Sequence, residues 1–344
     1  MNAQPPQPLK LIFKGRLEFG SERTYNMVLN HWNTRIENYF KSDILFKAEQ
    51  VFSADDYALS VPQQVLMSTE KHWRSTTALL KEVAQYALAG KVGAWWVQNG
   101  QILAEYNIEP KSDKTAVAEF IRGRELAQQG GMESASEALS NAIAKYERNA
   151  LAYERRGYVN YKLKNFNDAL YDFSKSIVIN PNNPEPHYGR GKIRMLKNEW
   201  EAAAVDFDCT IKRSIALQPI FWLARLKKGE CLVHAKKCAE AIPELQQFIK
   251  REFKAENPNF RRRRRAWHLL GKAFLGTGDI NAALDAFNQA LAIKEGVELL
   301  PEAEALLHRA IARKQAGAKG FAQDLETAAG LGNAEAKRLL AEWK

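Results

Sequence analysis

The chain has 344 residues, of which 46% are hydrophobic and 26% are charged, and its formal net charge at pH 7 is +10. This composition excludes a disordered chain, and no apolar run approaches the roughly 18–20 residues that a membrane span requires. The amino terminus lacks a positive segment followed by an apolar run, so we expect no secretion signal. Three cysteines are too few for a disulfide framework, which favours a reducing compartment, and we expect the cytoplasm.

The first 112 residues are predicted to alternate between strands and helices. Runs of alternating apolar residues predict strands, and Asn99-Gly100 is a favoured two-residue hairpin turn. Ser21 can cap a first helix, and either Ser68 or Thr69 can cap a second. The predicted elements are a strand at 9–19, a helix from 22 to about 41, strands at 43–52 and 57–61, a helix from about 70 that Gly90 ends, and strands at 92–97 and 102–106.

This order is β-α-β-β-α-β-β. Its first six elements match the split βαβ, ferredoxin-like arrangement, with a seventh strand appended. We therefore predict a small α+β domain of ferredoxin-like βαββαββ type over 1–112. Because this fold hosts many unrelated functions, it predicts no activity.

A regular pattern of large and small residues follows in the rest of the chain. Its clearest copy places four residues at i, i+3, i+4 and i+7 and then three more at i, i+4 and i+7, which predicts one stripe on each of two helices. These residues are Trp267, Leu270, Gly271 and Phe274, then Ala283, Phe287 and Ala290. Gly271 and Ala283 are small where the helices cross, and Phe287 fills the space beside the crossing. Asp279 can cap the second helix.

This pattern resembles the tetratricopeptide repeat, a helix–turn–helix unit of 34 residues. Six copies can be aligned through one small position: Gly123, Gly157, Gly191, Gly229, Gly271 and Ala310. The resemblance covers about 113–344 and divides it into six repeats at 113–333 and a capping helix at 334–344, which Asn333 can begin. It implies an all-α solenoid whose first helices line a groove for a peptide, a helix or a protein surface.

The positions expected to face that groove lie one and five residues after the first aromatic position of each repeat. They give a mixed basic and aromatic set of candidate partner-binding residues: Arg124, Tyr158, Tyr188, Lys192, His268 and Lys272. Cations can pair with carboxylates, and tyrosines suit rigid contacts. The expected partner is therefore a protein or peptide of acidic character. The alternative is that these residues only form a solvated face.

The basic character of the chain is concentrated at 184–302, which holds 21 Lys and Arg against 15 Asp and Glu, an excess of 6. Within it are five consecutive arginines, Arg261, Arg262, Arg263, Arg264 and Arg265. They are candidate anion-binding residues, and they support an alternative function as an RNA- or polyanion-binding protein. The competing interpretation is a solvated helix start that Glu252 and Glu256 partly neutralise.

Catalytic and metal-binding patterns do not stand out. The six histidines show no metal-ligand spacing, and Cys231 and Cys238 are too far apart in sequence for a C-x2-C pair. No nucleophile–base set or carboxylate pair is evident, so we expect no cofactor and no enzymatic activity. The sequence thus predicts a non-enzymatic scaffold or adaptor: an α+β domain followed by an all-α solenoid that binds a protein or peptide.

Overall fold

The structure is a computed structural model that describes residues 9–343, apart from the side chain of Val297. The chain divides into two compact units, Met1–Gly189 and Arg190–Lys344. The expectation about a secretion signal concerns an amino terminus that lies mostly outside the described residues. The domain boundaries at 112 and 333 stay predictions.

Within the described part of the first unit, five strands form one antiparallel sheet in the order β2-β3-β1-β4-β5. Two long helices and one short helix lie between the strands in sequence. In chain order these elements are β1 (Leu9–Glu18), α1 (Glu22–Arg35), α2 (Ala48–Val51), β2 (Phe52–Ser53), β3 (Ala58–Ser68), α3 (Glu70–Ala84), β4 (Ala89–Gln98) and β5 (Gln101–Ile108). The predicted antiparallel sheet with helices is confirmed, and its ferredoxin-like classification stays a prediction.

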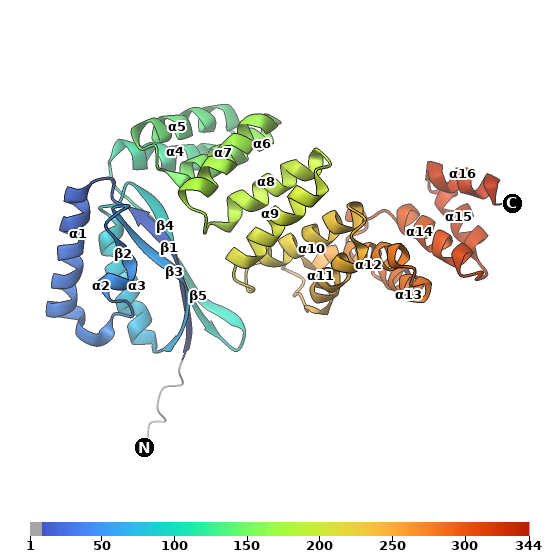
Figure 1. Ribbon diagram of the computed structural model, residues 1–344, viewed down its shortest axis with the longest axis horizontal. Helices are drawn as coiled ribbons and strands as arrows, with labels where there is room; N and C mark the ends of the chain where they lie inside the picture. Colours follow the sequence, from blue (N-terminus) through green and yellow to red (C-terminus); the bar gives the residue numbers. More distant parts are fainter. Residues whose placement is uncertain (1–8, 344) are drawn as a thin grey trace, which may run out of the picture. The chain divides into compact units, whose positions relative to one another are not determined.

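One face of this sheet carries the main core of the leading region, and α1, α2 and α3 lie on that side of it (Figure 1). Leu11 and Phe13 alternate along β1, so they point to the same face, and both are completely buried. The helices contribute Trp32 from α1 and Trp73 from α3 to the same core. The two-residue turn is also confirmed, because Asn99 and Gly100 both have positive φ, at 50° and 73°.

Two predictions for this region are wrong. Residues 43–52 are not a strand, because Lys41–Asp43 form a 3₁₀ turn and Ala48–Val51 form α2. Ala48 and Val51, three residues apart, are both buried, which is a helical spacing within a short apolar run. The second helix ends at Ala84 rather than at Gly90, which belongs to β4 with φ of 106°. A Cβ on Gly90 would lie 2.1 Å from the carbonyl oxygen of Arg16. The glycine is therefore needed for close strand pairing.

Residues 115–330 form six pairs of helices, and a further helix follows (Figure 1). The pairs are α4 (Thr115–Gln128) with α5 (Met132–Lys145), α6 (Ala150–Lys162) with α7 (Phe166–Ile179), α8 (Pro184–Leu196) with α9 (Trp200–Arg213), α10 (Pro219–His234) with α11 (Cys238–Lys250), α12 (Arg263–Thr277) with α13 (Ile280–Ala292), and α14 (Glu302–Gln315) with α15 (Phe321–Gly330). The prediction of stacked helical pairs is confirmed.

The small position of each repeat has the predicted role. A Cβ added to Gly157 would lie 2.9 Å from the ring of Phe173, and one added to Gly271 would lie 2.6 Å from the ring of Phe287. Both distances are shorter than an ordinary contact, so the large residue of the second helix packs directly on the glycine of the first. The spacing of these residues in the sequence thus encodes the crossing of each pair.

Predicted helix starts are confirmed where the capping side chain is present. Asp279 Oδ1 accepts from the Ala282 amide at 3.1 Å, after Gly278 ends α12 in the left-handed conformation. Asn333 Oδ1 accepts from the Ala336 amide at 2.9 Å and begins α16 (Ala334–Glu342). The last residue of the predicted 334–344 helix lies outside the described residues.

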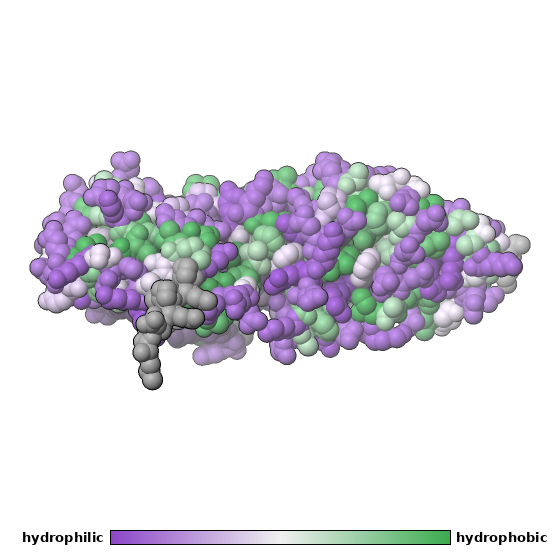
Figure 2. Space-filling view, turned by 90° about the horizontal axis from the view of Figure 1, so that it is seen from below, coloured by the Kyte–Doolittle hydropathy of each residue, from purple (hydrophilic) through white to green (hydrophobic). Residues whose placement is uncertain are grey.

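On the face seen in Figure 2, hydrophilic residues surround smaller hydrophobic patches.

Candidate functional site

The first helices carry the predicted partner-binding residues, and the structure gives these residues different surroundings. Tyr158 on α6 is the most open of the aromatic ones, with 38% of its surface exposed. The Lys162 ammonium lies 5.5 Å from the centre of the Tyr158 ring. A tyrosine next to a cation is suited to hold an acidic or aromatic group of a partner.

Arg124 on α4 is already engaged within the chain. Its Nη1 donates to Glu109 Oε2, and its guanidinium lies 5.6 Å from the centre of the Phe120 ring. A partner carboxylate would have to compete with Glu109 for this side chain. Tyr188 and Lys192 on α8 are half-buried, and Lys272 on α12 is half-buried as well. Their role as partner contacts stays a prediction.

His268 on α12 is buried, with 2% of its surface exposed. Its Nε2 lies 3.1 Å from His308 Nδ1, and the same His308 atom lies 2.9 Å from the main-chain oxygen of Glu304 on α14. The spacing of the histidines in the sequence did not indicate this pairing. The separation of 40 residues is close to one repeat, so the alignment of the repeats could have placed the two histidines on neighbouring first helices.

The last two arginines of the run, Arg264 and Arg265, are used inside the repeats. Arg264 is 1% exposed, and its Nη1 donates to the carbonyl of Ile293 at 2.7 Å. Arg265 donates to Glu230 Oε1 at 2.6 Å and to the carbonyl of Leu299 at 2.9 Å. These contacts hold the start of α12 against its neighbours.

The first three arginines of the run lie nearer to solvent. Arg261 has 68% of its side chain exposed and lies 3.4 Å from a carboxylate oxygen of Glu298. Arg262 donates to the carbonyl of Pro258, and the Arg263 guanidinium lies 4.7 Å from the centre of the Phe260 ring. The acidic partners of the run are thus Glu230 and Glu298, where the sequence had suggested Glu252 and Glu256. Anion binding by the run stays a prediction.

Ion pairs between the two helices of a repeat were missed from the sequence. A basic residue directly before the small position pairs with an acidic residue directly before the large position of the second helix, with a nitrogen–oxygen distance of 2.7 Å in every case. The pairs are Arg156–Asp172, Arg190–Asp206, Lys228–Glu244 and Arg309–Asp324. Their recurrence at one position in four repeats is visible in the sequence once the repeats are aligned.

Asp172 illustrates how closely these carboxylates are held. Arg156 donates to both of its oxygens, at 3.0 and 2.7 Å, and Asn160 donates to one of them at 3.0 Å. Burial raises the pKa of Asp172, although Arg156 and Asn160 act in the opposite direction. This group is completely satisfied within its repeat, so we assign it to packing and not to binding.

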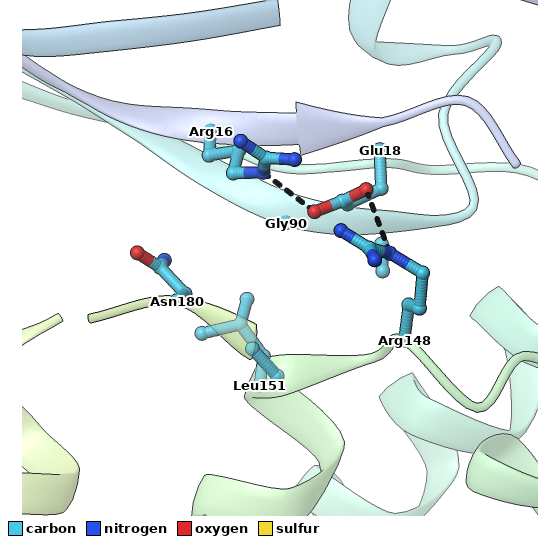
Figure 3. A pocket seen from close by; sticks show the side chains of 8 residues that line it. Arg16, Glu18, Gly90, Arg148, Leu151 and Asn180 are labelled. Atoms are coloured by element: carbon cyan, nitrogen blue, oxygen red, sulfur yellow. Dashed lines mark hydrogen bonds and ion pairs between the residues drawn. The ribbon is translucent and has the colours of Figure 1, made fainter. Parts of the chain in front are cut away.

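A pocket lies beside β1 and β4, next to the start of α6 (Figure 3). Glu18 is buried there and accepts from Arg16 Nε at 2.6 Å and from the Tyr146 hydroxyl at 3.3 Å, and Arg148 Nε lies 3.9 Å away. Burial raises the pKa of Tyr146. The free volume of about 10 Å³ accommodates one water molecule at most. This cluster therefore joins the sheet to the first repeats, and it offers no room for a substrate.

None of the helices within residues 9–343 is both long enough and apolar enough to cross a membrane.

Comparisons with known proteins match the repeats. The tetratricopeptide repeat family model matches residues 122–184 and 235–298. A TPR repeat-containing thioredoxin from Arabidopsis thaliana is 27% identical over 113 residues, which make up 33% of this chain and 29% of that protein. The chain thus spans less than a third of the length of this curated relative.

Solved structures are similar over part of the chain. YrrB, described as a TPR protein with an unusual peptide-binding site, has 18% identity and a TM-score of 0.48, covering 61% of this chain and 100% of that one. PilW, a type IV pilus biogenesis factor, has 19% identity and a TM-score of 0.49, covering 66% and 99%. Residues 122–184 and 235–298 are therefore tetratricopeptide repeats.

Proposed function

We propose that the chain is a non-enzymatic adaptor that binds a protein or peptide of acidic character through the first helices of its repeats. Proteins built from such repeats generally bind other proteins, because each repeat contacts only its neighbours and leaves part of its surface available. The observation that carries the proposal is Tyr158, a large aromatic side chain that remains exposed on α6.

The surroundings of Tyr158 favour a protein partner. Exposed tyrosines bind with little loss of conformational entropy, and they are enriched among residues that dominate binding energy. Lys162, one helical turn later, supplies a cation that a carboxylate of the partner can approach. A neighbouring side of α6 packs Gly157 against Phe173 and so is unavailable.

Binding of RNA or another polyanion is the less favoured function. Of the five arginines, Arg264 is buried and Arg265 is paired with Glu230. A polyanion would therefore meet fewer free cations than the sequence suggests. For the leading region we propose the ferredoxin-like arrangement, in which β1 lies between β3 and β4, and we assign it no catalytic role.

The repeat itself offers a matched control for a binding test. Tyr171 on α7 is 55% exposed, and Lys175 lies 5.6 Å from its ring centre, so it repeats the Tyr158–Lys162 arrangement on the second helix. The test is affinity capture from a lysate of the source organism, with and without nuclease, using wild type, Tyr158→Ala and Tyr171→Ala. The captured protein is then identified, purified and titrated.

We expect wild type and Tyr171→Ala to bind the same protein with and without nuclease. Tyr158→Ala should bind it roughly 10-fold or more weakly, since a dominant aromatic contact contributes more than about 1.4 kcal/mol. Equal binding by all three proteins would contradict the assignment to the first helices. Loss of every partner after nuclease treatment would favour the polyanion function.

A further inference from the structure

Three potential metal ligands meet between two first helices of the second unit. They are His268 on α12 and Glu304 and His308 on α14, and their ligand atoms all lie within 4.8 Å of one another. Glu304 and His308 are four residues apart, so they project from the same side of α14. Because α12 and α14 belong to successive repeats, the stacking of the repeats creates this cluster.

The distances suit a transition-metal ion that prefers imidazole. Zinc binds imidazole nitrogen at about 2.0–2.1 Å in a tetrahedral arrangement, which places two such nitrogens roughly 3.3 Å apart. His268 Nε2 and His308 Nδ1 are 3.1 Å apart. The Glu304 carboxylate supplies a third ligand, and it is only half-buried. Two imidazoles and one carboxylate, with a fourth position open, form a known type of zinc ligand set.

The two imidazoles share one proton at the place that a metal ion would occupy. His308 Nδ1 lies near two acceptors, His268 Nε2 and the Glu304 carbonyl oxygen, so a single Nδ1–H is shared between them. His268 Nε2 then presents its lone pair to that proton. A metal ion would take the place of the shared proton, and His308 would carry its proton on Nε2 instead.

The charges around the cluster and its imidazole ligands both restrict which ion can bind. Lys272 and Arg265 lie close enough to His268 to disfavour a further positive charge there. Arg265 is compensated by Glu230, at 2.6 Å, whereas the Lys272 ammonium forms no hydrogen bond or ion pair with another residue of the described part of the chain. Hard cations such as magnesium and calcium need several oxygen ligands, so this site is unsuited to them.

We propose that His268, Glu304 and His308 form a binding site for a divalent transition-metal ion of the zinc type, which would link the first helices of two successive repeats. The ion would occupy the place where the two imidazoles now share one proton. Since both helices would be held by one ion, binding would stabilise the last two repeats against local opening.

The site can be tested with the full chain, produced without a histidine tag and stripped of metal. Titration calorimetry with zinc and visible absorption with cobalt measure stoichiometry and geometry. The variants are His308→Ala and Glu304→Gln, and the matched control is His234→Ala. His234 is an exposed histidine in a different repeat, stacked on Trp200 with ring centres 4.3 Å apart. Circular dichroism verifies that each variant keeps its helical content.

We expect one zinc ion per wild-type chain, a tetrahedral cobalt spectrum and a higher melting temperature with zinc. His308→Ala should weaken binding by more than the roughly 10–100-fold typical of losing an outer-shell partner, and Glu304→Gln should weaken it less. His234→Ala should bind as wild type does, and Lys272→Met should bind more tightly. Absence of zinc binding at millimolar concentration, or unchanged binding by a folded Glu304→Gln and His308→Ala, would overturn the proposal. Because the readout is metal binding, failure would leave partner binding through Tyr158 untouched.

Discussion

The repeats α6–α7 and α12–α13 share one contact and differ in the residues around it. In both, a glycine of the first helix receives an aromatic ring of the second, Phe173 on Gly157 and Phe287 on Gly271. Beside that contact, α6–α7 contains the ion pair of Arg156 and Asp172. The equivalent positions of α12–α13 hold apolar side chains.

Those apolar side chains are Leu270, which is 3% exposed, and Ala286, which is 1% exposed. An ion pair in one repeat and an apolar pair in the other therefore occupy equivalent positions of the same fold. Buried ion pairs contribute little net stability, because desolvation offsets the attraction, and well-packed apolar residues can replace them. The comparison teaches that the small–large contact defines the repeat, whereas the neighbouring position tolerates any pair that is mutually satisfied.

Loss of the shared glycine–ring contact should give the largest loss of stability, and the same loss in both repeats. Phe173→Ala and Phe287→Ala each remove a buried ring, so each should cost about 3–5 kcal/mol of local stability. Native-state hydrogen exchange on the affected helix pair measures this, since stacked repeats need not unfold in one step. The exposed Tyr171→Ala should change stability by less than about 0.5 kcal/mol. A large loss of stability in only one of the two repeats would contradict the claim that this contact defines the repeat.

Loss of the ion pair between Arg156 and Asp172 should give the next largest loss of stability. Asp172→Ala leaves Arg156 and Asn160 without their acceptor. Breaking a buried pair costs about 3–5 kcal/mol, but 19% of the Arg156 side chain is exposed to water, so we expect roughly 2–3 kcal/mol. Hydrogen exchange of α6 and α7 measures the loss.

A transplant sharpens this prediction. The triple variant Arg156→Leu, Asn160→Phe, Asp172→Ala installs the side chains found at the equivalent positions of α12–α13. These are Leu270, Phe274 and Ala286. Its stability should return to within about 1 kcal/mol of wild type, because no unpaired charge remains. If the triple variant is as unstable as Asp172→Ala alone, the ion pair and the apolar pair are not interchangeable.

A smaller, pH-dependent effect should come from Glu230, which contacts the start of α12–α13. Burial acts to raise the pKa of Glu230, but Lys227 and Arg265 outweigh it and lower that pKa below the ordinary value. A lowered pKa in the folded state means that the carboxylate stabilises the fold above the unfolded value of about 4.3. This contribution is lost as the pH falls through the folded value.

Glu230→Gln should therefore destabilise the chain by about 1–2 kcal/mol at pH 7, and the difference from wild type should shrink below about pH 4. Denaturant melts between pH 3 and pH 7 measure it. Glu240→Gln, which changes an exposed carboxylate of α11, is the control and should show no such convergence. A constant difference at every pH would show that Glu230 acts through packing alone.

The elements that the sequence predicted well are those whose signal is local. Gly157 and Gly271 mark helix crossings by their spacing from an aromatic residue, and Asp279 and Asn333 mark helix starts by their capping chemistry. Residues 43–52 were assigned wrongly because a short apolar run fits a strand or a helix equally well. Only the packing of Ala48 and Val51 into the core decides for the helix.

The candidate site was predicted less completely, because it depends on contacts between distant residues. Tyr158 was placed on the first helix, and its exposure agrees with a surface role. His268 was assigned to the same surface, yet its ring is buried against His308, 40 residues away. No local spacing signals such a pair, and the same holds for Arg265 and Glu230, which come from successive repeats.

Photo-crosslinking tests the central claim of partner binding by the first helices most directly. A photoreactive amino acid would replace Tyr158 in one protein and Tyr171 in another, and each would be irradiated with the purified partner. We expect a crosslinked product from position 158 and none from position 171. Equal crosslinking from both positions, or crosslinking from position 171 alone, would contradict binding through the first helices.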